Sequence, residues 1–310
     1  MKIIFMGTPD FAVPTLQALI GSRHEIVGVY TQPDKEQGRG KKLVASPVKE
    51  CALEAGLPVF QPKSLRKQEV IDEMRALQAD AIIVAAYGQI LRKAVLNMTK
   101  YGCINVHGSL LPKYRGAAPI QWAVLNGEEV SGITIMQMDE GIDTGDILAQ
   151  QEIPLDPKET GDSLFEKLSL LGGPLLLKVL DGLEAGTIVP EKQGESSTEY
   201  AKMLDKSMGL LDFQKSAEEL ERLVRGLNSW PSAYTYYNGR MMKIWAADVV
   251  PDDSDHMPGT VCAVTKRDFA VKCGKDALKI TELQPEGKKR MLTDAFLRGC
   301  QIHEGDQIGS

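Results

Sequence analysis

The sequence is poor in cysteine, with five residues among 310. The five are scattered and form no C-x-x-C pair, so the sequence suggests neither a disulfide framework nor a zinc site. Reduced thiols are the simplest interpretation of this pattern, and they are typical of the cytosol. We therefore expect a cytoplasmic protein that needs no metal.

Long apolar runs are also missing. No stretch approaches the roughly 20 residues that a helix needs to span a bilayer, and the turn at Gly7 to Asp10 interrupts the apolar N-terminal run too early for a signal peptide. The formal net charge is −6, so the chain as a whole has no basic excess for nucleic acid or an anionic membrane. We expect no membrane partner, and any nucleic acid must be held by a local surface.

A third absence is the glycine-rich signature of dinucleotide-binding proteins. The first strand-to-helix turn reads Gly7-Thr8-Pro9-Asp10 and not G-x-G-x-x-G, so a nicotinamide or flavin cofactor lacks its main support in the sequence. The turn is more simply interpreted as a tight connection to a helix N-terminus.

The first half of the chain does contain short apolar runs that alternate with amphipathic helical stretches. Apolar strands joined by helices predict a mostly parallel, doubly wound α/β sheet of the Rossmann-like type. Ligands of such sheets bind beyond the carboxyl ends of the strands. The predicted strands cover 2–6, 25–31, 57–61, 80–86, 103–107 and 132–138, and the predicted helices cover 11–20, 47–55 and 68–77.

A long helix is predicted over 163–185, with a break at Gly172-Gly173-Pro174. Periodicity fades over 188–207, a polar stretch that has the character of an interdomain linker. A further helix around 217–226 and several short strands with turn residues follow, which is typical of a small antiparallel barrel. The sequence therefore predicts a first domain over 1–187 and a smaller second domain over 208–310.

The strand over 103–107 ends on Asn105-Val106-His107 and contains one of only four histidines. Because side chains alternate along a strand, Asn105 and His107 project from the same face where the strand stops. For an isolated pair of this kind, two hydrogen-bonded polar residues at a strand end would be the simpler interpretation.

A second informative stretch, Met136 to Leu148, places four acidic residues around two glycines. Calcium-binding EF-hand spacing is absent. The stretch is either a solvated acidic loop or a catalytic loop in which Asp143 reaches His107.

Together, INVHGSLLPKYRGAAPI and GITIMQMDEGIDTGDIL resemble the signature of the formyltransferases that use 10-formyltetrahydrofolate. FMGTPDFAVPTLQAL, TQPDKEQGRGKKLVASPVK, AAYGQIL, RGLNSWPSAYT and ITELQPEGKKRM extend the resemblance over nearly the whole chain. The methionyl-tRNA formyltransferases are the most similar family. The chain departs from the family pattern at Arg92, Phe213 and Ser229.

The resemblance implies transfer of the formyl group of 10-formyltetrahydrofolate to the α-amino group of methionyl-initiator tRNA, without a covalent enzyme intermediate. It implies Asn105, His107 and Asp143 as the catalytic group. It also implies that two loops bind the folate. One loop contributes Ser109, Leu110, Leu111 and Pro112, and the other contributes Tyr87, Gly88, Gln89 and Ile90.

The basic loop PDKEQGRGKKL would by itself be interpreted as mobile and solvated. The resemblance implies that its Arg39, Lys41 and Lys42 contact the tRNA acceptor end, where phosphate contacts supply affinity. It further implies a monomer with an OB-like, tRNA-binding C-terminal domain, whose most basic patch is Glu286 to Met291.

Two alternatives stay open at this point. The same chemistry could serve a small amine, such as an amino sugar or glycinamide ribonucleotide. A noncatalytic RNA-binding protein on an α/β scaffold is the alternative from a different class.

Overall fold

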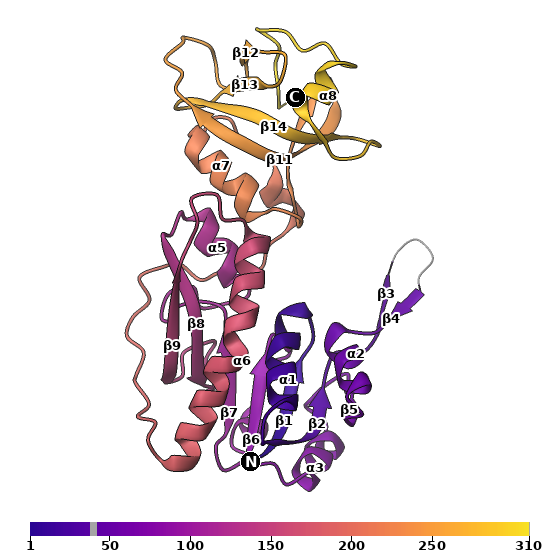
Figure 1. Ribbon diagram of the computed structural model, residues 1–310, viewed down its shortest axis with the longest axis vertical. Helices are drawn as coiled ribbons and strands as arrows, with labels where there is room; N and C mark the ends of the chain where they lie inside the picture. The colour runs from indigo at the N-terminus through magenta and orange to yellow at the C-terminus, as the bar shows by residue number, and fades with distance from the viewer. Residues whose placement is uncertain (38–41, 310) are drawn as a thin grey trace. The chain divides into compact units, whose positions relative to one another are not determined.

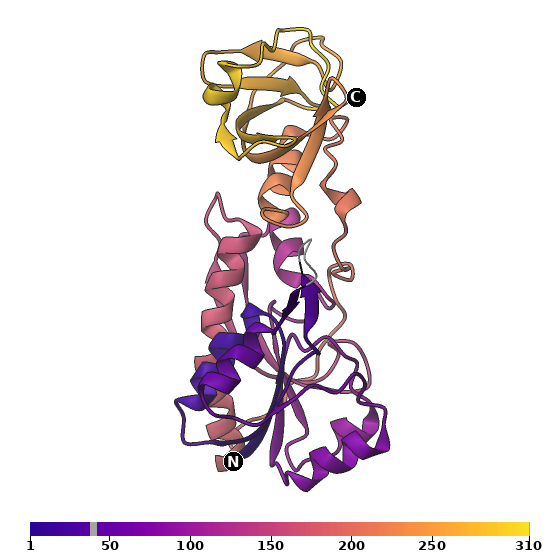
Figure 2. The ribbon, with the colours of Figure 1, turned by 90° about the vertical axis from the view of Figure 1, so that its right-hand side faces the viewer.

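A computed structural model describes residues 1–37 and 42–309 of the chain. Within it the chain folds into two compact units (Figures 1 and 2). The first unit holds Met1–Pro119, Val130–Pro154 and Phe165–Ala201, and the second holds Ile120–Glu129, Leu155–Leu164 and Lys202–Ser310. Each unit is described by itself.

A seven-stranded sheet forms the centre of the first unit, in the order β5-β2-β1-β6-β7-β8-β9. The pairs from β5 to β7 are parallel, and β8 and β9 join antiparallel. This mixed, mostly parallel sheet confirms the predicted α/β class. The strands are β1 (Lys2–Gly7), β2 (Glu25–Tyr30), β5 (Val59–Phe60), β6 (Ala81–Ala85), β7 (Cys103–His107), β8 (Val130–Gln137) and β9 (Ile147–Pro154).

Helices cover both faces of this sheet, as the continuous apolar runs of its strands require. One face of β1, β6 and β7 shares a single apolar cluster with α3 and α4. On the other face, α6 lies against Val106 of β7 and against α1. The helices are η1 (Asp10–Ala12), α1 (Val13–Ile20), α2 (Pro47–Glu54), α3 (Gln68–Ala76), α4 (Lys93–Leu96) and α6 (Gly161–Ala185).

The predicted break in the long helix is wrong. Helix α6 runs through Pro174 without interruption (Figure 1). A Cβ on Gly172 would lie 2.7 Å from Cγ1 of Val106, and one on Gly173 would lie 2.6 Å from Cβ of Ala18. The glycines therefore allow close packing against the sheet and α1. Pro174 has no N–H and so removes one main-chain hydrogen bond, but the helix continues through it.

The second unit contains an antiparallel sheet in the order β10-β11-β14-β13-β12, with β15 paired to β14. Figure 2 shows the sheet curving beside α7. Within the described residues β10 and β12 are the two ends of this path, so the sheet is not closed and the OB-like barrel stays a prediction. The strands are β10 (Ala233–Tyr237), β11 (Arg240–Val250), β12 (Val261–Val264), β13 (Phe269–Lys272), β14 (Ala277–Pro285) and β15 (Met291–Leu292).

Helix α7 (Ala217–Gly226) packs on this sheet where a helix is predicted. Ser216 and Glu219 form a capping box at its start, which satisfies N–H groups that have no partner within the helix. Leu220 and Val224 lie in the core of the unit together with Phe213. The remaining helices are α5 (Pro119–Leu125), η2 (Lys206–Gly209) and α8 (Thr293–Leu297).

The polar stretch 188–207 lies in the first unit as far as Ala201, and two bridges hold it there. Glu191 pairs with Ile147, and Ala201 pairs with Gly116. The predicted linker and domain boundaries stay predictions. Among the described residues, no helix combines the length and apolar character that crossing a membrane requires.

Candidate active site

The carboxyl end of β7 places Asn105 and His107 on one face of the first unit's sheet. Val106 between them points to the opposite face, where it meets α6. The alternation follows from the two-residue period of a strand. Both polar side chains are buried, with Asn105 exposed by 9% and His107 by 6%.

The imidazole of His107 is fixed at one of its nitrogens. Nε2 lies 3.0 Å from the carbonyl oxygen of Tyr114. A carbonyl can only accept, so Nε2 carries the proton. The other nitrogen, Nδ1, lies 3.7 Å from Oδ1 of Asp143. Because that gap is longer than a hydrogen bond, Nδ1 is the nitrogen that remains available for chemistry.

Asp143 reaches His107 from the loop between β8 and β9, which is where the acidic stretch lies. Its backbone φ is +53°, in the left-handed region that aspartate tolerates better than most residues. Its Oδ2 accepts a hydrogen bond of 2.9 Å from the main-chain N–H of Gly116. The loop closes tightly onto β8, since a Cβ on Gly145 would lie 1.8 Å from the carbonyl oxygen of Gln137.

The loop that follows His107 is anchored by Thr134 of β8. The Thr134 hydroxyl donates to the carbonyl of Ser109 at 2.6 Å and accepts from the N–H of Leu111 at 3.0 Å. Gln150 donates to the carbonyl of Leu111 and to the Thr134 hydroxyl. These bonds fix the shape of the Ser109–Pro112 segment next to the histidine.

The second predicted folate loop follows β6. Tyr87 is buried, and burial raises the pKa of its hydroxyl to about 12. The Gln89 amide bonds to the main chain of Leu65 and Pro62, so it ties this loop to a neighbouring one. Gly88 has a φ of +86°, and Ile90 projects into solvent.

Comparison with known proteins identifies the family. The formyl transferase family model matches residues 1–180, and the model of the formyl transferase C-terminal domain matches residues 203–301. The methionyl-tRNA formyltransferase of Lachnospira eligens is 55% identical over 314 residues, which cover 100% of each chain. That of Agathobacter rectalis is 52% identical over 305 residues, which cover 98% of each. The chain belongs to the methionyl-tRNA formyltransferase family.

Membership of this family makes the chain a one-carbon formyltransferase, and it rules out the noncatalytic RNA-binding alternative. Among solved structures, the sugar 3N-formyltransferase WlaRD, crystallised with dTDP and 5-N-formyl-THF, matches with a TM-score of 0.67. The match covers 93% of this chain and 99% of WlaRD at 21% identity, and it shows a common fold.

The basic loop of this methionyl-tRNA formyltransferase family member lies partly outside the described residues, which do not include Arg39 and Lys41. Lys42 is exposed at the start of β4 (Lys42–Val44), which pairs antiparallel with β3 (Lys35–Gln37). The flanks of the basic loop therefore form a short hairpin.

The acidic residues near Asp143 have partners of their own. Asp139 accepts hydrogen bonds from Gly141 and Thr144, and Asp146 forms an ion pair with Lys192. Within residues 1–37 and 42–309, no group of acidic, histidine and cysteine side chains has the arrangement of a metal site.

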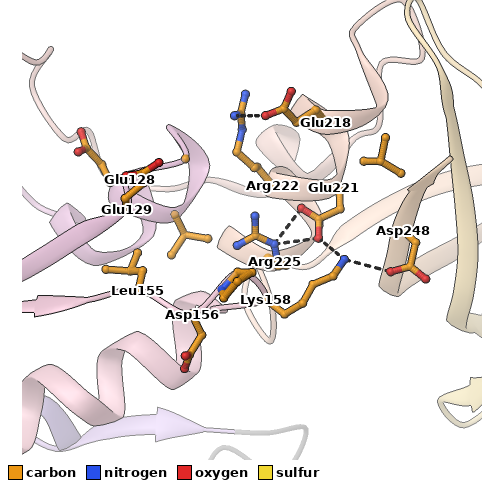
Figure 3. Close-up of a pocket in the computed structure, with 14 residues that line it drawn as sticks. Glu128, Glu129, Leu155, Asp156, Lys158, Glu218, Glu221, Arg222, Arg225 and Asp248 are labelled. Carbon is orange, nitrogen blue, oxygen red and sulfur yellow. Dashed lines mark hydrogen bonds and ion pairs between the residues drawn. The ribbon is translucent and has the colours of Figure 1, made fainter. Parts of the chain in front are cut away.

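The second unit holds a cavity of about 680 Å³ that the sequence did not suggest (Figure 3). Segments around Glu129 and Lys158 line it together with α7 and β11. Buried Glu221 stands at its centre, where both its oxygens lie 2.9 Å from Nε of Arg225 and one lies 2.9 Å from Nζ of Lys158. Lys158 also pairs with Asp248. None of the predicted site residues lines this cavity.

Proposed function

We propose that the protein transfers the formyl group of 10-formyltetrahydrofolate to the α-amino group of methionyl-initiator tRNA in the cytoplasm, as a monomer. Relatives that match over the full chain carry the name methionyl-tRNA formyltransferase, and WlaRD was crystallised with a formylated folate. The product, formylmethionyl-tRNA, serves translation initiation.

In this proposal the reaction is a direct attack by the amine on the formyl carbon. Negative charge develops on the formyl oxygen, and positive charge develops on the attacking nitrogen. A protonated His107 donates from Nδ1 to that oxygen, because Tyr114 holds the other ring nitrogen. The amide of Asn105, on the same face of β7, is the second donor. Loss of one such donor typically lowers a rate by roughly 100- to 1,000-fold.

Asp143 has two roles in the proposed mechanism. Its carboxylate, 3.7 Å from Nδ1, stabilises the imidazolium form of His107. It also accepts the proton of the attacking nitrogen, directly or through a water. General acid–base catalysis of this kind contributes about 100- to 10,000-fold. The tetrahydrofolate nitrogen takes up the proton that Asp143 accepted as its bond to the formyl carbon breaks, and it leaves as an amine. No serine or cysteine nucleophile and no covalent enzyme intermediate are needed.

Two binding surfaces complete the proposal. Folate lies against Ser109–Pro112 and Tyr87–Ile90, at the carboxyl edge of the sheet where such folds bind ligands. Arg39, Lys41 and Lys42 contact the tRNA acceptor end. The C-terminal domain, an OB-like barrel beginning near residue 208, holds the tRNA body.

The observation that carries this proposal is the approach of half-buried Asp143 to buried His107, whose Nε2 is held by a main-chain carbonyl. The test offers the purified protein 10-formyltetrahydrofolate with methionyl-initiator tRNA, and uncharged tRNA as the control. Formylmethionine released only from the charged tRNA supports the proposal. Transfer to a small amine, such as an amino sugar, without transfer to tRNA would contradict the proposed acceptor.

A further inference from the structure

The side chain of Gln193 connects a remote segment to the backbone of Asp143. Its Nε2 donates to the carbonyl of Asp143 at 2.9 Å and to the carbonyl of Gly145 at 2.6 Å. The two hydrogens of one amide therefore hold both ends of the turn that presents the Asp143 carboxylate. Gln193 lies 50 residues beyond Asp143 in the chain.

Arg115 fixes the orientation of this amide. Its Nε and Nη2 donate to Oε1 of Gln193 at 3.1 and 2.8 Å, and Nη2 also donates to the carbonyl of Gly194. With its oxygen occupied by the guanidinium, the amide must direct its nitrogen toward the two carbonyls. The oxygen of the Gln193 amide therefore faces donors, and its nitrogen faces acceptors.

The same short segment holds the Asp143 carboxylate from the other direction. Gly116, next to Arg115, donates its N–H to Oδ2 of Asp143. Arg115 therefore holds the backbone of Asp143 through Gln193, and Gly116 holds its carboxylate. Both residues directly follow Tyr114, whose carbonyl fixes His107. One stretch of chain sets the position of both members of the pair.

We infer that Gln193 is a positioning residue for formyl transfer, which acts through Asp143 and touches neither substrate. Asp143 has a left-handed backbone, and its distance from Nδ1 of His107 depends on how that backbone is held. A displacement of about 1 Å at a reacting group can cost about 100-fold in rate. The inference rests on the role of Asp143 in the proposed function.

The test compares Gln193→Met, which has a similar length and no amide, with the unchanged protein in formyl transfer to methionyl-tRNA. We expect kcat to fall about 10- to 100-fold, because a displacement of up to about 1 Å at a reacting group can cost about 100-fold. KM for both substrates should stay within about twofold, because no substrate contact is lost. Lys192→Met is the matched control: it removes the neighbouring ion pair with Asp146 and should leave kcat unchanged.

A second comparison places Gln193→Met in an Asp143→Asn protein. If Gln193 acts through Asp143, the added loss in kcat should be less than about twofold. Arg115→Lys keeps the positive charge and loses the paired donors of the guanidinium. It should lower kcat less than Gln193→Met does, and combining the two substitutions should lower kcat little further. This variant keeps the inference testable if Gln193→Met does not fold.

The outcomes separate the two claims. An Asp143→Asn protein with low kcat beside a Gln193→Met protein with normal kcat overturns the positioning role and leaves the proposed mechanism standing. A full further loss from Gln193→Met in the Asp143→Asn protein also overturns the positioning role. Normal kcat in Asp143→Asn overturns the proposed role of Asp143, and with it this inference.

Discussion

The two nitrogens of His107 have different tasks, and single substitutions can separate them. The Tyr114 carbonyl holds Nε2, whereas Nδ1 faces Asp143. The amide nitrogen of glutamine can occupy the place of Nε2, so His107→Gln should keep the hydrogen bond to Tyr114. It should lose the donor at Nδ1 and the positive charge.

We expect His107→Gln to lower kcat at least about 100- to 1,000-fold, the typical cost of one oxyanion donor. Its thermal unfolding midpoint should stay close to that of the unchanged protein. The matched control is His107→Ala, which loses both nitrogens and should be less stable as well as inactive. Activity in His107→Gln near the normal level would show that Nδ1 does not take part.

How much of this site the sequence could predict depends on sequence separation. Asn105 and His107 are two residues apart in a strand, so strand geometry alone places them together. Contact of Asp143 with His107 is one of two interpretations that the acidic stretch allows, and the resemblance to a family favours it. Only the folded loop brings the two side chains to 3.7 Å. Gln193 and Arg115 lie 78 residues apart, within stretches that read as linker and loop, and nothing local in the sequence connects them.

Elements show a similar division between local and long-range information. Strands buried on both faces are readable as apolar runs, and they lie where the sequence predicts them. The sequence does not predict strand β9, because Gln150, Gln151 and Glu152 interrupt its apolar residues and only Leu148 is buried. It does not predict the hairpin of β3 and β4 either, because the charged residues there are typical of a solvated loop.

Helix α6 gives an element-scale prediction, since its two central glycines allow close packing and do not break the helix. An alanine raises helix propensity by about 1 kcal/mol over glycine. A Cβ at position 172, however, would press on Val106 at 2.7 Å, and overpacking costs typically about 1–3 kcal/mol. We expect Gly172→Ala to lower the free energy of unfolding in urea. Leu170→Ala, at an exposed position of the same helix, is the control and should change it little. A gain in stability from Gly172→Ala would mean that the helix shifts freely on the sheet.

At the scale of the whole molecule, the second unit is assembled from three separate stretches of chain. The family model for the C-terminal domain covers only the last of them, residues 203–301. Segment Leu155–Leu164 belongs to the same unit, where Arg225 donates to the carbonyl of Glu159 and Lys158 pairs with Glu221. Local sequence patterns could not reveal this, because the segment lies between β9 and the body of α6.

This construction predicts that Glu221 matters only when the inserted segment is present. In the full chain, Glu221→Ala removes the carboxylate that pairs with both Arg225 and Lys158 in the cavity. Breaking a buried pair costs about 3–5 kcal/mol. A fragment of residues 202–310 lacks Lys158 and Glu159, so the Arg225 pair is the interaction that remains for Glu221 there. Such a pair within one helix contributes at most about 1 kcal/mol when exposed.

Urea unfolding of four proteins tests this, namely the full chain and the fragment, each with and without Glu221→Ala. We expect the substitution to cost the full chain at least about 2 kcal/mol more than the fragment, because Lys158 and the segment that covers the Arg225 pair are present only in the full chain. A fragment that does not fold at all agrees with the same account, since the unit would then need its inserted segments. Equal costs in the two contexts would show that 202–310 is a complete domain, and that the ion pairs of Lys158 add nothing to its stability.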